Sequence, residues 1–520
     1  MGINQNSMKK IKKALISLSD KKNLKTLLNV LKKNNIQFIS SGGTYKEIKK
    51  LKFSCVEVSE FTGFPEILDG RVKTLHPKIH AGILNKRNNK SHQKQIAKNN
   101  FENIDLVIVN FYPFEKTLQN SKNHEKIIEN IDIGGPTMVR AAAKNYNDVT
   151  VITSTNQYKK LINELNCNNG CTSYTFRQKM SEEAFAETAY YDALISSYFN
   201  KITKNSFPKK KILFANLIEK LRYGENPHQY GAIYSKNAEL SIKQVHGKKL
   251  SYNNYNDIFS ALTISKSLPK NTGTVIVKHA NPCGVSIHKN HKKSYQLALN
   301  CDPISAYGGI VSCNYKINKS LALELNKIFL EVVIANDFEK EALKILKKKK
   351  NLRIINANNL ALEEVDNFTS NQNSILMQSS DINLFVKKNF DVVSKKKPSV
   401  KMLKNLIFSF NICRFVKSNA IIIANKDATI GIGSGQPSRL DSCKIAINKM
   451  KKFHKEDIND EIIAASDAFF PFVDGIEKLV QAGIQAVIQP SGSIRDKEII
   501  RFANQTDTIL VFSKTRHFKH

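Results

Sequence analysis

Short apolar runs that end in polar or glycine-rich turns recur along this chain, and they restrict its fold more than any other feature. In the N-terminal part they alternate with helical patterns, and the expected strands cover 14–19, 36–39, 106–109 and 148–153. Such alternation is typical of an α/β fold with a parallel sheet. Ligands of these folds bind beyond the carboxyl ends of the strands. We therefore expect functional residues in the turns that follow the runs.

The turn after 36–39 has the composition of a phosphate site. Residues 40–44 read Ser-Ser-Gly-Gly-Thr and lead directly into a helical pattern. Backbone N–H groups converge where a helix begins, and the helix dipole favours an anion there. Further along, Arg71 and Lys73 are two residues apart, so an extended backbone would project both cations to one face. Such a pair suits a phosphate or a developing oxyanion.

The most distinctive run lies in the C-terminal part. Residues Thr274–Val277 are all β-branched, as is typical of a strand buried in a parallel sheet, and Lys278 and His279 follow directly. A neighbouring ammonium favours the neutral imidazole, which is a suitable general base. The alternative is a hydrogen-bonded histidine that closes a turn. Residues 281–284, Asn-Pro-Cys-Gly, have the composition of that turn.

A polar, basic stretch divides the chain. The helical pattern at 178–199 is followed by NKITKNSFPKKK at 200–211, which is typical of a linker. We expect domains at 1–200 and 201–520. No apolar run reaches the ~18 residues that span a membrane, and we find no signal-peptide core. The eight cysteines have irregular spacing, which favours free thiols. We expect a cytoplasmic protein.

The formal net charge of +35 admits two interpretations. A strongly basic surface could bind nucleic acid. However, the lysines are dispersed, and they are not interleaved with aromatic side chains that would stack on bases. We favour a compositional bias that attracts small anionic substrates, without a nucleic-acid partner.

Three other motifs suggest ligands less strongly. His76 and His80 are four residues apart, but Pro77 disfavours a continuous helix and no acidic third ligand is nearby, so we expect no metal site. The glycine-rich run at 429–439 lacks the βαβ context of a dinucleotide fingerprint. The three phenylalanines within 469–472 suit either core packing or a slot for a flat heterocycle.

A series of stretches from near residue 15 to residue 520 resembles the bifunctional purine-biosynthesis enzymes that combine AICAR formyltransferase with IMP cyclohydrolase. The stretches, in order, are SLSDK, SSGGTYKEI, FTGFPEILDGRVKTLHPKIH, VNFYPF, ENIDIGGPTMVRAAAKN, RYGENPHQ, LSYNN, IVKHANPCGV, DPISAYGGI, FVKSNAI, IGIGSGQPSR, ASDAFFPF, IQPSGSIRD and RHFKH. The resemblance implies a methylglyoxal-synthase-like parallel-sheet domain, the cyclohydrolase. It also implies a larger formyltransferase domain of two duplicated cytidine-deaminase-like α/β units. The implied reactions are formyl transfer from 10-formyltetrahydrofolate to AICAR and dehydrative closure of formyl-AICAR to IMP.

By motif, the resemblance assigns residues to the cyclohydrolase site. The candidates for chemistry are Lys73, Tyr112, Asp132 and Lys144. The candidates for nucleotide binding are Ser19, Lys21, Ser40, Ser41, Gly42, Gly43, Arg71, Thr74, Asn110 and Ile133. Ring closure needs a donor or cation at the formyl oxygen and a base or polariser at the attacking amide. Lys73 and Tyr112 would serve the first role and Asp132 the second.

The resemblance also assigns the transferase site. His279 would take a proton from the 5-amino group of AICAR, Lys278 would stabilise charge, and Asn419 would position the formyl oxygen. The other residues expected around AICAR are Arg222, Tyr223, Gly308, Glu331, Phe469, Arg516 and Phe518. Those expected near the folate are Arg439, Asp474, Ser493 and Ile494. The resemblance further implies a homodimer whose transferase sites draw on both subunits.

Two departures from familiar patterns remain. Position 473 is Val, where similar sequences often have Arg, so we expect at most a modest effect on folate binding. Zinc deaminases need H-x-E followed by P-C-x-x-C. The chain's H-x-E, at 454–456, lies downstream of its Pro-Cys, and no C-x-x-C is present. We expect no zinc. A nucleic-acid-binding protein and a deaminase-type zinc hydrolase are the competing interpretations.

Overall fold

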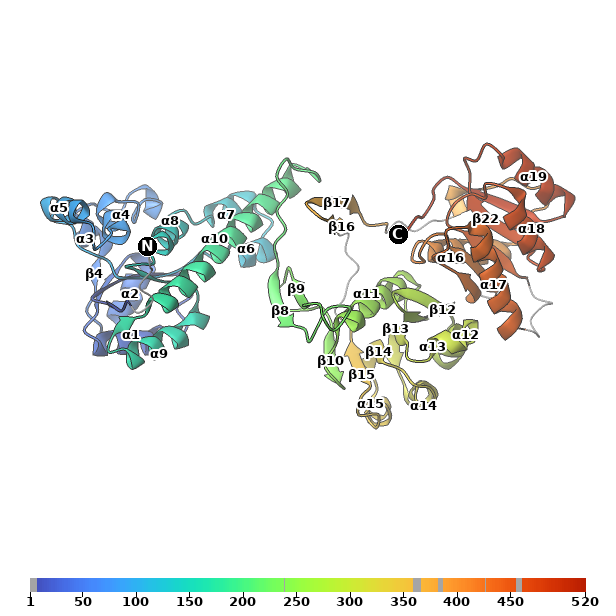
Figure 1. Cartoon of the computed structure of the whole chain (residues 1–520), viewed down its shortest axis with the longest axis horizontal. Helices are drawn as coiled ribbons and strands as arrows, with labels where there is room; N and C mark the ends of the chain where they lie inside the picture. Colours follow the sequence, from blue (N-terminus) through green and yellow to red (C-terminus); the bar gives the residue numbers. More distant parts are fainter. Residues whose placement is uncertain (1–6, 238, 359–365, 382–386, 426, 455–460) are drawn as a thin grey trace. The chain divides into compact units, whose positions relative to one another are not determined.

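The computed structural model describes residues 7–237, 239–358, 366–381, 387–425, 427–454 and 461–520. The chain forms two compact units, Met1–Ala215 (unit 1) and Asn216–His520 (unit 2) (Figure 1). Helix α10 (Tyr174–Ile202) closes unit 1 and includes the first residues of the stretch expected as a linker. None of the described helices is both long and apolar enough to cross a membrane.

Unit 1 is built on a five-stranded parallel sheet, which confirms the class expected for this part. The strand order is β4-β3-β2-β5-β6. The strands are β2 (Lys13–Leu18), β3 (Gln37–Ser40), β4 (Val56–Glu57), β5 (Leu106–Asn110) and β6 (Thr150–Ile152). A short ribbon pairs β1 (Lys9–Lys10) with β7 (Cys171–Thr172). Residues of β2 and β5 are almost entirely buried, as expected for central strands covered on both faces.

Helices cover this sheet. The main ones are α1 (Leu24–Lys33), α2 (Gly42–Lys50), α4 (Pro77–Leu84), α8 (Gly134–Lys144), α9 (Tyr158–Cys167) and α10. The shorter ones are α3 (Val58–Thr62), η1 (Leu68–Gly70), α5 (Lys90–Lys98), α6 (Phe114–Asn120), α7 (His124–Glu129) and η2 (Thr155–Gln157). Leu24, Leu27, Leu28 and Leu31 form the buried face of α1, at the spacing that a helix requires. Helix α8 contacts β5, β6 and α10.

Unit 2 contains a sheet of twelve described strands in the order β10-β15-β14-β13-β11-β12-β20-β19-β21-β22-β23-β18. The strands are β10 (Lys243–His246), β11 (Gly273–Lys278), β12 (Asn281–Ile287), β13 (Ile310–Ile317), β14 (Val332–Phe338), β15 (Arg353–Asn356), β18 (Phe390–Val392), β19 (Ile421–Asn425), β20 (Ala428–Gly433), β21 (Ile463–Ser466), β22 (Ala486–Pro490) and β23 (Ile509–Ser513). Two separate hairpins, β8 (Asn216–Lys220) with β9 (Ala232–Ser235) and β16 (Asp366–Asn371) with β17 (Ser374–Ser379), complete its β structure.

Unit 2 contains the same series of helices and strands twice. The first copy is α11 (Tyr252–Ser267), β11, β12, α12 (His291–Cys301), β13, α14 (Lys319–Leu325), β14, α15 (Lys340–Leu346) and β15, with a short α13 (Pro303–Ala306) inserted. The second is α16 (Val400–Cys413), β19, β20, α17 (Arg439–Phe453), β21, α18 (Val473–Gln481), β22, α19 (Asp496–Gln505) and β23. The copies meet where β12 runs antiparallel to β20, and the strand order is mirrored on either side. This repeat confirms the expected duplication.

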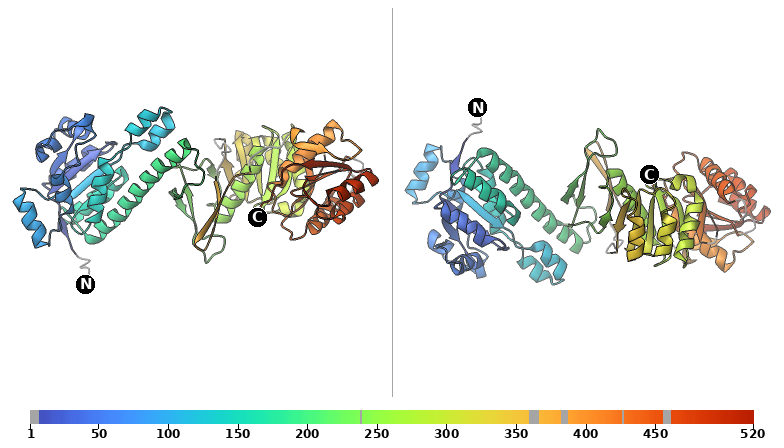
Figure 2. Two further views of the ribbon diagram at one scale, coloured as in Figure 1. Left: turned by 90° about the horizontal axis from the view of Figure 1, so that it is seen from above. Right: turned by 90° about the horizontal axis from the view of Figure 1, so that it is seen from below.

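The duplicated sheet is covered on both faces (Figures 1 and 2). On one face a single core, which includes Val275 and Ile422, runs across both copies beneath α11 and α16. On the other face the cores are separate, one including Ile276 beside α12 and α14 and one including Ile423 beside α17 and α18. Alternate residues of β11 and β19 thus enter different cores, as the strand period of two requires.

Strand directions bring many turns to one edge of this sheet. The pairings place the carboxyl end of β11 beside the amino ends of β12 and β13, and those of β14 and β15 follow. Across the β12–β20 junction, the same edge carries the carboxyl end of β20, the amino end of β19 and the carboxyl ends of β21, β22 and β23. We call this the His279 edge.

Two expectations about β11 were wrong. The strand is antiparallel to both β12 and β13, because burial on both faces by helices makes a β-branched run equally suitable for either pairing. Residues 281–284 are not the turn but the start of β12. The turn is formed instead by His279 and Ala280, both with positive φ. Pro282 fits within the strand because the register shifts there.

Candidate functional sites

A cavity of about 600 Å³ opens in unit 1 beyond the carboxyl ends of β2, β3 and β5. It brings together most of the residues that the sequence assigned to the cyclohydrolase site. These are Ser19, Lys21, Ser41, Gly43, Arg71, Lys73, Thr74, Asn110, Tyr112, Asp132 and Ile133. The position follows from the parallel sheet, since turns after neighbouring strands meet at one edge.

Two ammonium groups flank the start of α2 in this cavity. A methyl group at Gly42 would lie 3.7 Å from Lys73 Nζ, and one at Gly43 would lie 3.8 Å from Lys21 Nζ. Ser41, the N-cap residue, makes no side-chain capping bond. The first backbone N–H groups of the helix therefore face a space with two cations. Such a corner binds a phosphate or another compact anion.

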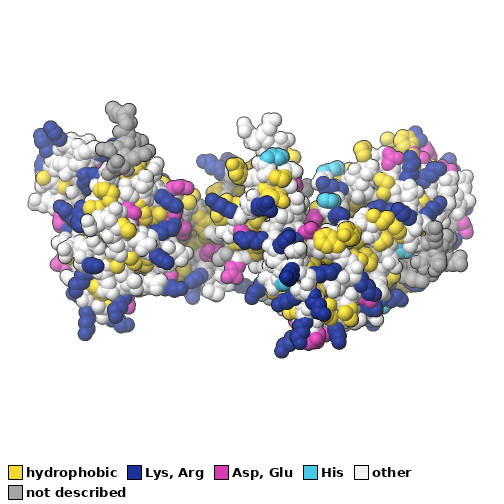
Figure 3. Space-filling view, turned by 60° about the horizontal axis from the view of Figure 1, so that its bottom comes forward, with side chains coloured by type: hydrophobic (Ala, Val, Ile, Leu, Met, Phe, Trp, Pro, Cys, Tyr) yellow, Lys and Arg dark blue, Asp and Glu magenta, His cyan; other side chains and the backbone are white. Residues whose placement is uncertain are grey.

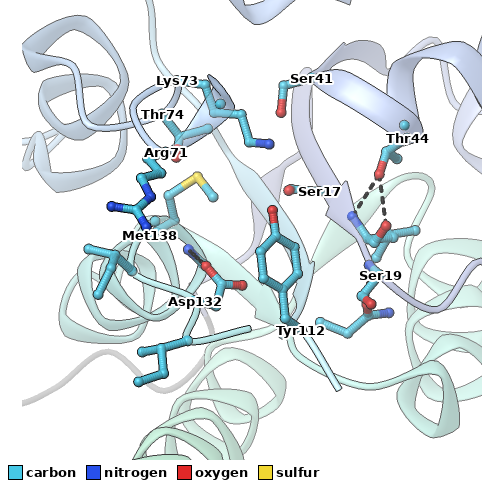
Figure 4. A pocket seen from close by; sticks show the side chains of 18 of the residues that line it. Ser17, Ser19, Ser41, Thr44, Arg71, Lys73, Thr74, Tyr112, Asp132 and Met138 are labelled. Carbon is cyan, nitrogen blue, oxygen red and sulfur yellow. Dashed lines mark hydrogen bonds between the residues drawn. The ribbon is translucent and has the colours of Figure 1, made fainter. Parts of the chain in front are cut away.

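Lys73, Tyr112 and Asp132 meet in the middle of the cavity. Figure 4 shows the Lys73 amino group and the Tyr112 hydroxyl directed toward the same space, with the Asp132 carboxylate beside them. Burial raises the pKa of Asp132, while backbone N–H groups of Gly135 and Tyr112 and the charge of Lys73 oppose that rise. The Gly135 N–H donates to Asp132 Oδ1 over 2.8 Å. A methyl group at Gly135 would lie 2.5 Å from Oδ2, so this carboxylate position depends on glycine.

Polar side chains hold the turn after β2. Asn110 Oδ1 accepts hydrogen bonds from the backbone N–H groups of Ser19 and Asp20, at 2.6 and 2.9 Å. The Thr44 hydroxyl accepts from the Leu18 N–H at 2.8 Å and donates to the Leu18 carbonyl at 3.0 Å (Figure 4). Asn110 thus acts on the backbone of the turn, and Ser19 is presented to the cavity.

Arg71 differs from the expectation of an extended segment. Its backbone is helical, with φ −63° and ψ −30°. It follows a tight turn in which Leu68, Asp69 and Gly70 all have positive φ. Its guanidinium forms a two-point ion pair with Glu129, with Nε 3.0 Å from Oε1, and this pairing raises the pKa of Arg71. Both side chains are more than half exposed at the rim of the cavity. Arg71 and Lys73 still line one cavity, through a curled loop.

Three assigned residues do not line this cavity. Ser40 is fully buried, and its hydroxyl donates to the Ile16 carbonyl at 2.7 Å. Gly42, with φ +51°, is not a lining residue, although a methyl group on it would approach Lys73 Nζ. Lys144 is exposed at the last residue of α8, whose first turn lines the cavity. A rise of 1.5 Å per residue puts it about 15 Å along that helix.

The sequence reasoning missed several lining residues, among them Thr44, Glu129, Gly134 and Met138. Gly134 had a readable signal, since it belongs to a glycine pair at the start of a helix. A methyl group there would lie 2.6 Å from the Thr74 hydroxyl. No local sequence signal pointed to Glu129, because its partner Arg71 is 58 residues away in the chain.

In unit 2, Lys278 and His279 end β11 on the His279 edge. Lys278 Nζ donates to the Tyr307 carbonyl at 2.8 Å, just before Gly308. The side chain of His279 is exposed. The backbone N–H groups of His279 and Ala280 donate to the Asp257 carboxylate, at 3.3 and 2.7 Å. The imidazole is therefore available to a ligand while its backbone is held.

Asn419 lies on the same edge, just before β19, and its amide is fully engaged. Its Nδ2 donates to the carbonyls of Gln436 and Pro437 at 2.8 and 3.0 Å, and its Oδ1 accepts from Arg439 Nη2 at 2.7 Å. Arg439 is only 9% exposed and also pairs with the fully buried Asp467. In this arrangement Arg439 fixes Asn419, a role that its assignment to the folate did not anticipate.

A single asparagine joins the two copies of the repeat at this edge. Asn281 Oδ1 accepts a hydrogen bond from the Lys417 N–H at 3.1 Å, and its Nδ2 donates to the His279 carbonyl at 3.2 Å. These two hydrogen bonds connect the His279 turn of the first copy to the segment that precedes Asn419 in the second copy.

A second cavity, of about 470 Å³, opens beside β8 and the start of β15. Arg222 and Tyr223 line it together with further cations, among them Lys248, Lys249 and Arg353. Glu219 also lines it and pairs with Lys249, and the lining remains cationic on balance. Glu331, at the amino end of β14, accepts from Arg353 Nη1 at 2.7 Å. The cavity suits an anionic group.

The other assigned residues lie along the His279 edge, all but Asp474 in loops. Phe469, Ser493 and Ile494, Arg516 and Phe518 follow β21, β22 and β23, and Asp474 lies in the first turn of α18. The Arg516 guanidinium lies 4.6 Å from the centre of the Phe518 ring. Ile494 is fully exposed, and Phe469 is partly buried.

Among the residues with described positions, no group of three His, Cys, Asp or Glu side chains is placed to hold a metal ion. Residues 455 and 456 of the H-x-E run lie outside that part of the chain. All eight cysteines are free thiols. Lys and Arg side chains are scattered over the face shown in Figure 3 and do not gather in one patch.

The family model described as AICARFT/IMPCHase bienzyme matches residues 142–449, and the model of the MGS-like domain matches residues 23–137. The chain belongs to the AICARFT/IMPCHase bienzyme family. It is accordingly a bifunctional enzyme, an AICAR formyltransferase and IMP cyclohydrolase that catalyses the last two steps of purine biosynthesis.

Relatives that carry the name bifunctional purine biosynthesis protein PurH match along the full length of this bienzyme. The protein of Leptospira biflexa is 44% identical over 517 residues, which cover 99% of this chain and 100% of the relative. The protein of Persephonella marina is 43% identical, covering 98% of this chain and 100% of the relative. That of Bradyrhizobium diazoefficiens is 42% identical over 98% and 99% of the two chains.

Proposed function

We propose that the two activities are divided between the units, with cyclohydrolysis in the cavity of unit 1 and formyl transfer on the His279 edge of unit 2. The observation that carries this assignment is that each unit gathers a distinct set of chemical groups. Unit 1 offers two ammoniums at a helix start beside a phenol and a carboxylate. Unit 2 offers an exposed imidazole beside an ammonium.

In the cyclohydrolase, the 5′-phosphate of formyl-AICAR binds between Lys21 and Lys73 at the start of α2. The carboxamide nitrogen attacks the formamide carbon, and a C–N bond forms. Asp132 accepts the proton of that nitrogen, while Lys73 and Tyr112 stabilise charge on the formyl oxygen. That oxygen then leaves as water with the proton held by Asp132 and the proton of the formamide N–H. The C–O bond breaks, a C=N bond forms at the former formamide nitrogen, and IMP results. What supports these roles is the convergence of the three side chains in one cavity. Lys144 would act from farther away.

In the transferase, the cosubstrate is 10-formyltetrahydrofolate. The 5-amino group of AICAR attacks the formyl carbon and His279 takes its proton. The bond between that carbon and N10 of the folate breaks, N10 receives a proton, and tetrahydrofolate leaves. Lys278 stabilises the developing charge, and Asn419, held by Arg439, lines the formyl-transfer position. The phosphate of AICAR suits the cationic cavity with Arg222 and Arg353.

We also propose a homodimer in the cytoplasm. The support for a second subunit is the β16–β17 hairpin, on which Phe368, Ile375 and Leu376 are each more than half exposed. A two-stranded hairpin is marginally stable alone, so a partner surface would stabilise it. The free cysteines suit a reducing compartment.

The assignment is tested with Lys73→Ala and His279→Ala in the full chain. Lys73→Ala should lower cyclisation of supplied formyl-AICAR by about 100-fold or more, the scale of a lost oxyanion stabiliser, and leave formyl transfer intact. His279→Ala should lower formyl transfer by about 100- to 10,000-fold, the scale of a lost general base, and leave cyclisation intact. Intermediate and IMP are followed by chromatography. Loss of both activities in either variant would contradict two separate sites.

A further inference from the structure

The turn that carries His279 has an uncommon backbone. His279 and Ala280 both adopt the left-handed conformation, with φ of 53° and 57°. This is the two-residue hairpin turn that ordinarily selects Asn-Gly or similar pairs. A side chain with Cβ is disfavoured there, and alanine has no polar group that compensates locally. The surrounding structure must therefore hold the turn in place.

Side chains bind every backbone polar group of this turn. The N–H groups of His279 and Ala280 both donate to Asp257, at 3.3 and 2.7 Å. The Ala280 carbonyl accepts from the Ser260 hydroxyl at 3.0 Å, and the His279 carbonyl accepts from Asn281 Nδ2 at 3.2 Å. Asp257 supplies two of the four bonds, and both Asp257 and Ser260 come from helix α11.

The second copy of the repeat repeats this arrangement with a different side chain. Asn405 stands at the same place in α16 as Asp257 in α11, five residues after the first residue of each helix. Its Oδ1 accepts from the N–H of Asp427, which also has positive φ, 62°, in the turn between β19 and β20. That turn lies at the opposite edge of the sheet. The amide of Asn405 is thus enough to hold a turn that carries no histidine. The turn that carries His279 is held by the carboxylate of Asp257 instead.

The carboxylate adds two things that an amide cannot. It accepts from both N–H groups at once, whereas an asparagine has one acceptor oxygen and would turn a donor toward the second N–H. It also places negative charge close to His279.

We propose that Asp257 is a positioning residue for formyl transfer, which holds the His279–Ala280 turn from α11 so that the imidazole meets the amine of AICAR. It acts through His279 and does not touch the reacting atoms. This proposal rests on the assignment of formyl transfer to the His279 edge. The His279→Ala variant tests that assignment separately.

The test is Asp257→Asn in the full chain, with both activities and thermal unfolding measured. The second copy already uses asparagine at this place, so we expect the variant to fold, with a small fall in the melting temperature because one N–H group loses its acceptor. The kcat of formyl transfer should fall by about 100-fold, the scale of a misplacement of about 1 Å, with the KM for AICAR changed much less. Asp257→Glu should retain more activity than Asp257→Asn. Cyclisation of supplied formyl-AICAR should be unchanged.

Asn405→Ala is the matched control, because it removes the corresponding acceptor at the opposite edge. It should leave the kcat of formyl transfer unchanged. Ala280→Gly gives a second, independent measurement, since glycine adopts positive φ without support. The loss caused by Asp257→Asn should be smaller in the Ala280→Gly background than in the native one.

Three results would overturn the proposal while the assignment of the site stands. One is a kcat of Asp257→Asn equal to that of the native enzyme when His279→Ala is inactive. Another is a rise in KM without a fall in kcat. The third is an equal loss from Asn405→Ala. If His279→Ala keeps full transferase activity, the assignment of the site is itself wrong.

Discussion

At the residue scale, the role as a base that we propose for Asp132 links the burial of its carboxylate to the pH dependence of ring closure. Burial raises its pKa from the ordinary value of an aspartate, and a base must be ionised to accept a proton. A raised pKa means that the carboxylate is present above that pKa and is lost as pH falls through it. Cyclisation should therefore decline on acidification at a higher pH than an ordinary carboxylate near pKa ~3.9 would give.

The measurement is the rate of closure of supplied formyl-AICAR between about pH 4 and pH 8, with Asp132→Asn as the comparison. The variant should be slow throughout and should lack the acid decline. An acid decline of the same position and size in Asp132→Asn would show that another group titrates, and Asp132 would not be the base.

Some of the site residues could be predicted from the sequence and others could not. Lys73, Ser41 and His279 lie in recognisable turns or runs, and the sequence alone assigned them. Asp257 and Glu129 act on partners 22 and 58 residues away, respectively, and nothing local marks them. The sequence assigned Arg439 to the folate site. Its bonds to Asp467 and Asn419 depend on how α17 packs beside β21, so they could not be predicted from the sequence.

At the element scale, the sequence predicted where strands lie better than it predicted the direction in which they pair. The expected run at Thr274–Val277 is a strand, and polar residues do follow it. Its antiparallel pairing was not predictable from the run, because period-two burial and β-branching do not depend on the direction of the neighbouring strand. The parallel sheet of unit 1 was predictable, because strand–helix alternation leaves few other connections.

The junction of α17 with β21 gives a prediction at this scale. Arg439, the first residue of α17, pairs with Asp467, which follows β21 and is fully buried. Asp467→Asn leaves the guanidinium buried without its counter-charge, which costs about 3–5 kcal/mol in comparable cases. We expect a lower melting temperature for unit 2 and a loss of formyl transfer, because Asn419 loses its anchor. Calorimetry and both activity assays check this.

Asp441→Asn is the matched control for that junction. Asp441 lies in the same helix, but its pair with Lys444 is about half exposed, and such pairs contribute about 1 kcal/mol or less. It should leave stability and both activities nearly unchanged. If Asp467→Asn behaved in the same way, the buried pair would not be what fixes Asn419.

At the scale of the whole molecule, each unit has cores of its own. The clusters of unit 1 contain residues between Ile11 and Tyr191, and those of unit 2 contain residues from Leu250 onward. The excess of lysine is scattered over the face shown in Figure 3, so it favours the approach of small anions without defining a site. What specifies each site is the local arrangement on its own sheet.

Separate cores predict that residues 1–215 expressed alone will fold and cyclise formyl-AICAR. Among the residues that the structure describes, those that line the cavity of unit 1 lie between Ser17 and Met138, all within this fragment. The rate should stay within about tenfold of the full chain, which corresponds to less than about 1.4 kcal/mol in the barrier. A fragment that ends at residue 200 would cut α10 before Ile202 and should be less stable. A folded 1–215 fragment without cyclohydrolase activity would mean that unit 2 contributes to the first site, and the division of labour between the units would be wrong.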